Sequence, residues 1–219
     1  MSRALSLTLI AVALAAAVAT MLYGARRASP PAAEAPSIAA PSAPAAAPAP
    51  TRDAAPRGPR AGRVLSVDEA IKELDLIRPP RPKLADDFTI ATADGTSFRL
   101  SAHRGRAVFV NFWATWCPPC LEEMPAMERL WRAQKDTGLV MLAVSVDADS
   151  AVVAPFLKGH GLTFAAGLDA KMDLANTFGI RALPSSFIVD REGRLVALAL
   201  GPRAWDNVAA HSLVEGLAR

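Results

Sequence analysis

Two cysteines, Cys117 and Cys120, are the residues of this 219-residue chain whose spacing points most directly to chemistry. They are its only cysteines and stand in the segment Trp116-Cys117-Pro118-Pro119-Cys120. Two intervening residues close too short a loop for a structural disulfide to gain much stability. A zinc site needs further ligands at suitable spacing, and the three histidines are isolated: His103, His160 and His211. A redox dithiol beside a βαβ pattern is the interpretation that fits best.

The position of this pair, after a predicted strand and at the start of a predicted helix, suits disulfide exchange. The attacking species is a thiolate, and a helix N-terminus lowers the pKa of Cys117 because it favours negative charge. Cys120, one turn further in, should be more buried and should resolve the mixed disulfide that Cys117 forms. Pro118 suits the first helical position, whereas Pro119 removes another N–H donor. The sequence leaves the sign of their joint effect on the reduction potential open.

The elements that position the pair follow from the hydrophobic pattern. Residues 107–113 are a nearly continuous apolar run, which predicts a strand buried on both faces. A helix at 118–134 and a second buried strand at 139–146 follow. Around them we predict a hairpin with its turn at Asp94-Gly95, helices at 149–159, 171–178 and 205–218, an extended piece at 163–165, and strands at 185–190 and 194–200. This order predicts an α/β fold, a mixed central sheet with helices on both faces.

A short helix is predicted ahead of this arrangement. Ser66 and Glu69 match a capping box, apolar residues follow at helical spacing as far as Ile77, and Pro79-Pro80 stop the helix. We therefore expect a short amphipathic helix and connector at 63–83, packed on a main domain at 84–219. Docking of a partner on this helix is the alternative.

Residues 1–62 differ in composition from the rest of the chain. They hold nine of the 18 prolines but only one of the 13 aromatic residues, Tyr23. Six arginines against two acidic residues give them a charge of 6 − 2 = +4, whereas the remainder has 18 basic and 19 acidic residues, or −1. A nucleic-acid binder should carry its basic excess on the folded domain, so we exclude that class.

This N-terminal part predicts a membrane segment and a linker. Residues 4–24 lack charge and are long enough to cross a bilayer as a helix. We expect 1–27 to be a membrane anchor, with a cleaved signal peptide as the alternative. Residues 28–62, rich in Ala and Pro, cannot bury enough apolar area to fold and should form a disordered linker.

The segment from Asn111 to Pro125, NFWATWCPPCLEEMP, resembles the active-site segment of TlpA/ResA/CcmG-type thioredoxin-like proteins. The resemblance runs from Asp87 to the end of the chain and includes the segments 144–147, 182–190 and 201–205. It implies a thioredoxin-like fold with an extra N-terminal hairpin and an inserted helix-strand piece. It also implies a membrane-tethered reductase of disulfides in exported proteins, facing the bacterial periplasm and renewed by a membrane electron donor of the DsbD/CcdA kind. No cofactor is expected, and the client (an apocytochrome, a copper-site protein or a broader set) is left open.

The resemblance also implies roles for residues around the dithiol. Glu123, three residues after Cys120 on the helix, would exchange a proton with it, since a desolvated carboxyl titrates nearer neutrality. The alternative is a solvated helix charge, the environment we expect for Glu122. Pro184 would be a cis proline facing the dithiol, leaving the backbone of Leu183 free to pair with an extended substrate.

The remaining expectations concern flanking residues. Trp116 would line the substrate surface, whereas Trp113 belongs to the core. Asn111 stands where thioredoxins generally have a buried Asp, which moves the expected proton chemistry to Glu123, and Asn111 itself should make hydrogen bonds. The residues Asp147 and Asp149 are interpreted as helix caps.

Three other functions compete for the same thiols. An oxidase or isomerase would use an identical dithiol but a more oxidising potential. A copper carrier or redox sensor could hold Cu(I) between two thiolates, although no third ligand is evident nearby. A peroxidase fits less well, since its cysteine would need a different hydroxyl spacing from that of Thr115-Trp116-Cys117.

Overall fold

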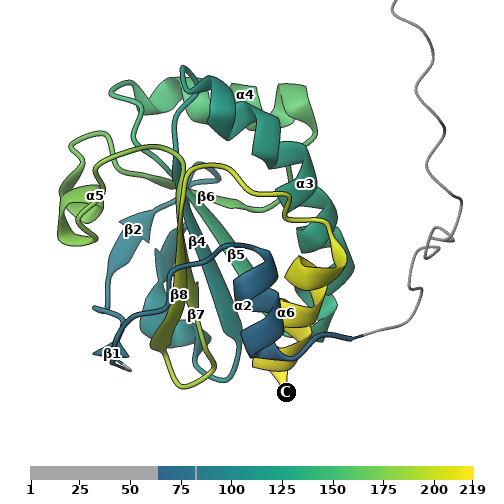
Figure 1. The fold of residues 1–219 in the computed structure, drawn as a ribbon. Helices are drawn as coiled ribbons and strands as arrows, with labels where there is room; N and C mark the ends of the chain where they lie inside the picture. The colour runs from purple at the N-terminus through teal and green to yellow at the C-terminus, as the bar shows by residue number, and fades with distance from the viewer. Residues whose placement is uncertain (1–63, 82) are drawn as a thin grey trace, which may run out of the picture. The chain divides into compact units, whose positions relative to one another are not determined.

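The computed structural model describes residues 64–81 and 83–219 of the chain (Figure 1). The expected anchor at 1–27 and linker at 28–62 lie outside the described residues. Within the described part, no helix combines the length and apolar character that crossing a membrane requires.

A six-stranded mixed sheet forms the centre of the described fold, in the order β1-β8-β7-β4-β5-β6. β4 pairs parallel with β5 and antiparallel with β7, and β5 pairs parallel with β6. A separate hairpin, β2–β3, turns at Asp94-Gly95 as predicted. The strand bounds are β1 (Lys83–Leu84), β2 (Thr89–Ala91), β3 (Ser97–Arg99), β4 (Ala107–Trp113), β5 (Leu139–Ser145), β6 (Ala165–Leu168), β7 (Ser185–Val189) and β8 (Arg194–Leu200).

Helices cover both faces of this sheet, as predicted. Figure 1 shows α2, α3 and α6 on one side and α5 on the other. The bounds are α2 (Val67–Glu73), α3 (Pro118–Gln134), α4 (Val153–His160), α5 (Asp173–Thr177) and α6 (Val208–Ala218), with 3₁₀ turns at Leu100–His103, Lys135–Thr137 and Ser150–Val152. The helix predicted at 149–159 is thus a 3₁₀ turn followed by α4.

The central strands β4 and β5 support the dithiol, which follows the C-terminal end of β4. All seven residues of each are buried, which confirms the interpretation of their apolar runs. Because alternate side chains of a strand face opposite sides, Phe109 and Asn111 of β4 point to the same layer, the one that holds α3 and α6. The ring of Phe109 lies edge-on to Trp205 there, 4.7 Å between centroids.

The helix α2 begins as predicted but ends earlier. Ser66 caps it, and the reciprocal bond with Glu69 completes the capping box. The helix stops at Glu73 because Asp75 takes a left-handed conformation, φ +51°, and Ile77 then pairs with Leu198 of β8. Pairing with the sheet therefore overrides the helical spacing that reached Ile77. The helix packs on α6, which confirms the expectation that it packs on the main domain.

Three further differences concern element bounds. β1, which pairs with β8, was not predicted, because two exposed residues carry no alternating pattern. The extended piece expected at 163–165 is the strand β6, which starts only at Ala165. The last helix begins at Val208 rather than 205, because Asn207 caps it by accepting the N–H of Ala210.

Candidate active site

A disulfide joins Cys117 and Cys120 at the start of α3, at the end of the sheet where β4 stops. Cys117 occupies the N-cap position and is 4% exposed, whereas Cys120 is 1% exposed. The deeper burial of Cys120 confirms the order expected from the sequence. Cys117 is therefore the sulfur nearer to solvent, and Cys120 lies behind it within the first turn of the helix.

The backbone donors at this helix start are largely absent or occupied. Pro118 and Pro119 have no N–H, and the N–H groups of Cys120 and Leu121 both donate to the carbonyl oxygen of Cys117, at 3.0 and 3.2 Å. The Cys117 side chain receives no capping hydrogen bond. A thiolate at Cys117 would thus depend on the helix dipole more than on direct N–H donors.

The loop before the dithiol is held by Asp147. The carboxylate of Asp147 accepts the backbone N–H of Thr115 at 3.0 Å, the hydroxyl of Thr115 at 2.7 Å and the hydroxyl of Ser145 at 2.7 Å. The interpretation of Asp147 as a helix cap is therefore wrong: it follows β5, whose parallel pairing with β4 brings it to the loop after β4. Asp149, by contrast, caps the 3₁₀ turn through Ala151 as expected.

An open groove of about 410 Å³ lies beside the dithiol. Trp116, which is 66% exposed, borders it together with Cys117 and Pro118. The opposite side comes from the segment before β7 and from residues after β5 and β6: Val146, Met172, Ile180, Arg181, Ala182 and Leu183. The groove is mainly apolar, with the exposed Arg181 as its one basic lining residue.

The peptide bond between Leu183 and Pro184 is cis, which confirms that expectation. Leu183 lines the groove, whereas Pro184 is buried and directly precedes β7. Pro119 is half-buried and does not line the groove. Of the residues predicted around the dithiol, the structure thus brings Trp116, Pro118 and Leu183 to one surface with Cys117.

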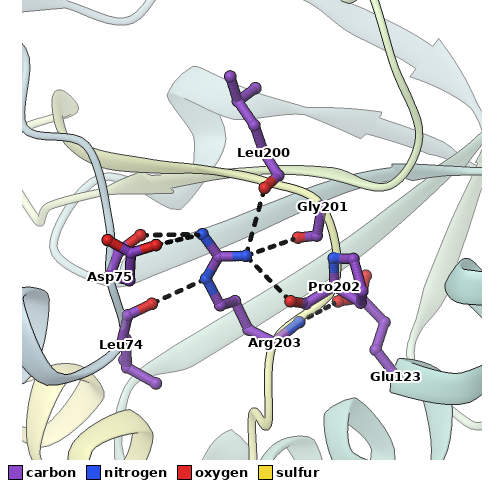
Figure 2. Close-up of polar contacts among 7 residues, drawn as sticks. All are labelled: Leu74, Asp75, Glu123, Leu200, Gly201, Pro202 and Arg203. Carbon is purple, nitrogen blue, oxygen red and sulfur yellow. Dashed lines mark hydrogen bonds and ion pairs between the residues drawn. The ribbon is translucent and has the colours of Figure 1, made fainter.

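Glu123 lies behind the dithiol, on the buried side of α3. It is 3% exposed, whereas Glu122 is exposed, as expected for the two residues. Its carboxylate accepts three hydrogen bonds: from Asn111 Nδ2 at 2.8 Å, from Trp205 Nε1 at 2.9 Å and from the backbone N–H of Arg203 at 3.0 Å. Figure 2 shows the Arg203 backbone contact. The interpretation of Glu123 as a solvated charge is therefore wrong.

Burial raises the pKa of the Glu123 carboxyl, and its hydrogen bonds oppose that rise. Removal from water disfavours the charged carboxylate and is the larger effect. The donors Arg203 N–H, Trp205 and Asn111, and the charge of Arg203, favour the charged form. The balance leaves the pKa above that of an ordinary glutamate, which is what a group that exchanges protons near neutral pH needs.

Sequence reasoning assigned no role to three residues around this carboxyl. Arg203 and Trp205 reach Glu123 from the segment after β8, and Ser186 of β7 accepts from Asn111 Nδ2 at 3.0 Å. Asn111 makes hydrogen bonds as expected, and it meets Ser186 because the two are register partners across β4 and β7. The family resemblance included the segment 201–205 but assigned no function to Arg203 or Trp205. That resemblance was the one feature of the sequence that could have pointed to them.

Among residues 64–81 and 83–219, no three His, Cys, Asp or Glu side chains are grouped as metal ligands would be. The arrangement consists instead of a dithiol, an apolar groove beside its outer sulfur and a buried carboxyl behind its inner one. These are the parts that disulfide exchange requires: a nucleophile, a resolving thiol and a proton acceptor.

Comparison with known proteins gives a consistent picture. The model of the AhpC/TSA family matches residues 83–198. The thiol-disulfide oxidoreductase ResA of Geobacillus thermodenitrificans is 35% identical over 127 residues, covering 58% of this chain and 73% of the relative. The protein of the same name from Bacillus thuringiensis strain Al Hakam is 32% identical over 129 residues, 59% of this chain and 75% of the relative. A crystal structure of a thiol:disulfide interchange protein of the thioredoxin family from Chlorobium tepidum superposes with a TM-score of 0.55 at 28% identity, covering 62% of this chain and 99% of that one.

Proposed function

The chain belongs to the AhpC/TSA family and is a thioredoxin-like thiol–disulfide oxidoreductase, and on that premise we propose that it works as a reductase of disulfides in exported proteins. Reduction of the client, rather than its oxidation, is inferred from one observation: the backbone N–H groups near Cys117 are either missing or already engaged in hydrogen bonds. A dithiol becomes a strong oxidant when its reduced form is stabilised. Here Pro118 and Pro119 supply no N–H, and the next two N–H groups bind the Cys117 carbonyl, so the thiolate gains little from direct donors.

The reaction proceeds in two exchanges. The Cys117 thiolate attacks one sulfur of a client disulfide, forming a mixed disulfide and releasing the other client sulfur as a thiolate. Cys120, whose proton passes to the Glu123 carboxylate, then attacks the Cys117 sulfur. The internal disulfide forms, and the second client sulfur leaves as a thiolate that takes up a proton from water. Two electrons have moved from the dithiol to the client.

The groove beside Cys117 fits a client polypeptide in extended conformation. Its apolar lining and the exposed ring of Trp116 suit side chains next to the client cysteine, and Arg181 suits a carboxylate at the rim. Leu183 would pair with the client backbone, and Pro184 would hold that segment opposite the dithiol.

The cellular setting is proposed from the sequence. We propose that 1–27 is a bacterial inner-membrane anchor, 28–62 a linker, and 63–83 a short helix and connector ahead of a thioredoxin-like domain at 84–219 in the periplasm. Cleavage of the first segment as a signal peptide is the alternative. A membrane electron donor of the DsbD/CcdA kind would reduce the Cys117–Cys120 disulfide after each cycle.

Trapping of clients tests the proposed exchange. Cys120→Ser leaves the attacking Cys117 but removes the resolving thiol, so mixed disulfides should accumulate and appear as dithiothreitol-sensitive adducts on non-reducing gels. The double variant Cys117→Ser, Cys120→Ser is the control and should form none. Identification of the trapped proteins would name the client class. Absence of adducts with Cys120→Ser in cells that make the protein would contradict the proposal.

The reduction potential of the dithiol tests the direction. The side chain of an N-cap residue normally accepts the N–H of the second or third helical residue, and Pro119 holds the second position. Pro119→Ala restores that donor and should make the potential less negative by about 30 to 65 mV, since a hydrogen bond to a charged group contributes about 1.5 to 3 kcal/mol and about 30 mV corresponds to 1.4 kcal/mol for two electrons.

Pro118→Ala is the matched control, because the N–H of the first helical residue does not normally reach the cap side chain. Its potential, measured by equilibration with glutathione, should stay within a few millivolts of the parent value. A parent potential as oxidising as that of DsbA, about −120 mV, would contradict the reductase proposal.

A further inference from the structure

Arg203 connects the N-terminal helix α2 with the buried carboxyl of Glu123. Its backbone N–H donates to Glu123 Oε2, and the indole N–H of Trp205, two residues later, donates to the same oxygen. Two of the three hydrogen bonds that Glu123 accepts therefore come from one short segment after β8. The position of this segment decides how well the carboxylate is stabilised.

The side chain of Arg203 also holds the segment after β8 in place, through hydrogen bonds to the carbonyls of that segment. Its guanidinium donates to three carbonyl oxygens of its own loop, those of Leu200, Gly201 and Pro202, at 3.2, 3.4 and 3.0 Å. Figure 2 shows the guanidinium between these carbonyls and the end of α2. The Arg203 side chain is 20% exposed, although its bonds to the Leu200 and Pro202 carbonyls lie at the surface.

The end of α2 supplies the remaining acceptors. Arg203 Nε donates to the carbonyl of Leu74 at 2.8 Å, and Nη2 donates to the carbonyl of Asp75 at 2.9 Å. The last carbonyls of a helix lack partners within the helix and favour a cation. Arg203 supplies both the hydrogen-bond donors and the positive charge at the point where α2 ends and the chain turns toward β8.

The charges that act on Glu123 are few. Arg203 is the cation whose charge lowers the pKa of Glu123. Asp75, whose carboxylate is 97% exposed, lies 3.4 Å from the guanidinium. Asn111, Ser186 and Trp205 are neutral. On α3 itself, the titratable neighbour one turn away is Cys120 in its reduced form.

We propose that Arg203 is a positioning residue for the thiol chemistry, through which docking of α2 controls the hydrogen bonds and the charge at Glu123. The inference rests on the proton-exchange role proposed for Glu123. When α2 is docked, its end holds the guanidinium, and the loop then presents the Arg203 and Trp205 donors to the carboxylate. When α2 is displaced, the donors loosen and the charged form of Glu123 loses support.

The Trp205 indole N–H reports on Glu123 without requiring turnover. In the full-length protein, its ¹H–¹⁵N resonance, assigned with Trp205→Phe, should titrate with the carboxyl, at a midpoint above the pKa of an ordinary glutamate. Arg203→Gln removes the cation and the clamp, and should move the midpoint upward by about 0.5 to 1 pH unit. Arg203→Lys keeps the charge with fewer donors and should give a smaller rise. It also serves as the test if Arg203→Gln does not fold.

A second variant displaces α2 and leaves Arg203 in place. A Cβ at Gly216 of α6 would lie 2.6 Å from Cγ2 of Val67 in α2, so Gly216→Val should wedge the two helices apart. We expect the Trp205 midpoint to rise as in Arg203→Gln. The matched control is Arg129→Gln, which removes the Arg129–Asp206 ion pair near the same loop without touching Glu123, and should leave the midpoint unchanged.

An unchanged midpoint in folded Arg203→Gln would overturn the positioning role, and an unchanged midpoint in folded Gly216→Val would overturn the link to α2. An indole resonance that does not titrate in the parent protein would also overturn the inference. The proposed function fails differently: in that case Cys120→Ser traps no client, whatever the Trp205 titration shows.

Discussion

Replacement of Cys117 by serine should abolish disulfide exchange, lowering the rate of client reduction at least about 10³-fold. The serine hydroxyl is not ionised near neutral pH, so the attacking anion is lost, while the N-cap position tolerates serine. The measurement is reduction of a fluorescent peptide disulfide with dithiothreitol as the terminal reductant. The thermal midpoint should be compared with that of the parent in its reduced form, which lacks the same disulfide.

Cys120→Ser provides the contrast. It should react once with the peptide disulfide at a rate close to that of the parent and then stop as a mixed disulfide, because Cys117 is unchanged and only resolution is lost. If Cys117→Ser kept more than a tenth of the parent turnover, or if Cys120→Ser failed to react even once, the assignment of the two thiols would be wrong.

Glu123→Gln should slow the resolution step about 10²-fold, the lower end of the range for general acid–base catalysis. The amide cannot take the proton of Cys120. The step is measured as the decay of a preformed Cys117 mixed disulfide, followed by stopped flow at several pH values. The difference between variant and parent should shrink at high pH, where hydroxide removes the thiol proton directly. Glu122→Gln, one residue away and exposed, is the matched control and should decay like the parent.

The same substitution has a signature in stability. Because burial raises the pKa of Glu123 in the folded state, the folded protein holds this proton at pH values where the unfolded chain has released it. The contribution of Glu123 is therefore fully present below the ordinary glutamate pKa and is lost as pH rises through the raised folded pKa. Urea unfolding of the parent should show this loss, and Glu123→Gln should lack it. Equal pH dependence in the two proteins would contradict the raised pKa.

The surroundings of Glu123 allow that variant to fold. Asn111 Oδ1 has no hydrogen-bond partner among the described residues. With the glutamine oxygen facing Arg203 N–H and Trp205, the new amide would face Asn111. A 180° rotation of the Asn111 amide then presents Oδ1 to it, and Ser186 Oγ can donate to the same oxygen. The loss of rate can therefore be separated from loss of structure.

The sequence predicted best what depends on near neighbours. The start of α3 at Pro118, the buried strands β4 and β5 and the capping box at Ser66 all follow from spacing within one element. Each of these features depends on a sequence pattern that lies within a single helix or strand.

What the sequence did not predict depends on the order of strands. Arg203 and Trp205 meet Glu123 across 80 and 82 residues of chain, because β8 lies beside β7, and β7 beside β4. Asp147 reaches Thr115 across 32 residues through the parallel pairing of β4 and β5. No local pattern encodes contacts between residues so far apart in the chain. The family resemblance therefore singled out Glu123, but nothing indicated which groups donate hydrogen bonds to its carboxylate.

The central sheet ends in β1 on one side and β6 on the other, and short pieces of chain pair with its longer strands on both sides. Along β8, Ile77 and the short β1 occupy the outer backbone positions. Along β6, Thr92 bridges to Gly167, and the N–H of Ala93 donates to the carbonyl of Ala166. Unpaired strand edges are templates for edge-to-edge aggregation. The paired positions along β8 and β6 leave less free backbone through which two copies could join their sheets, while the client pairing proposed for Leu183 lies at the groove beside Cys117.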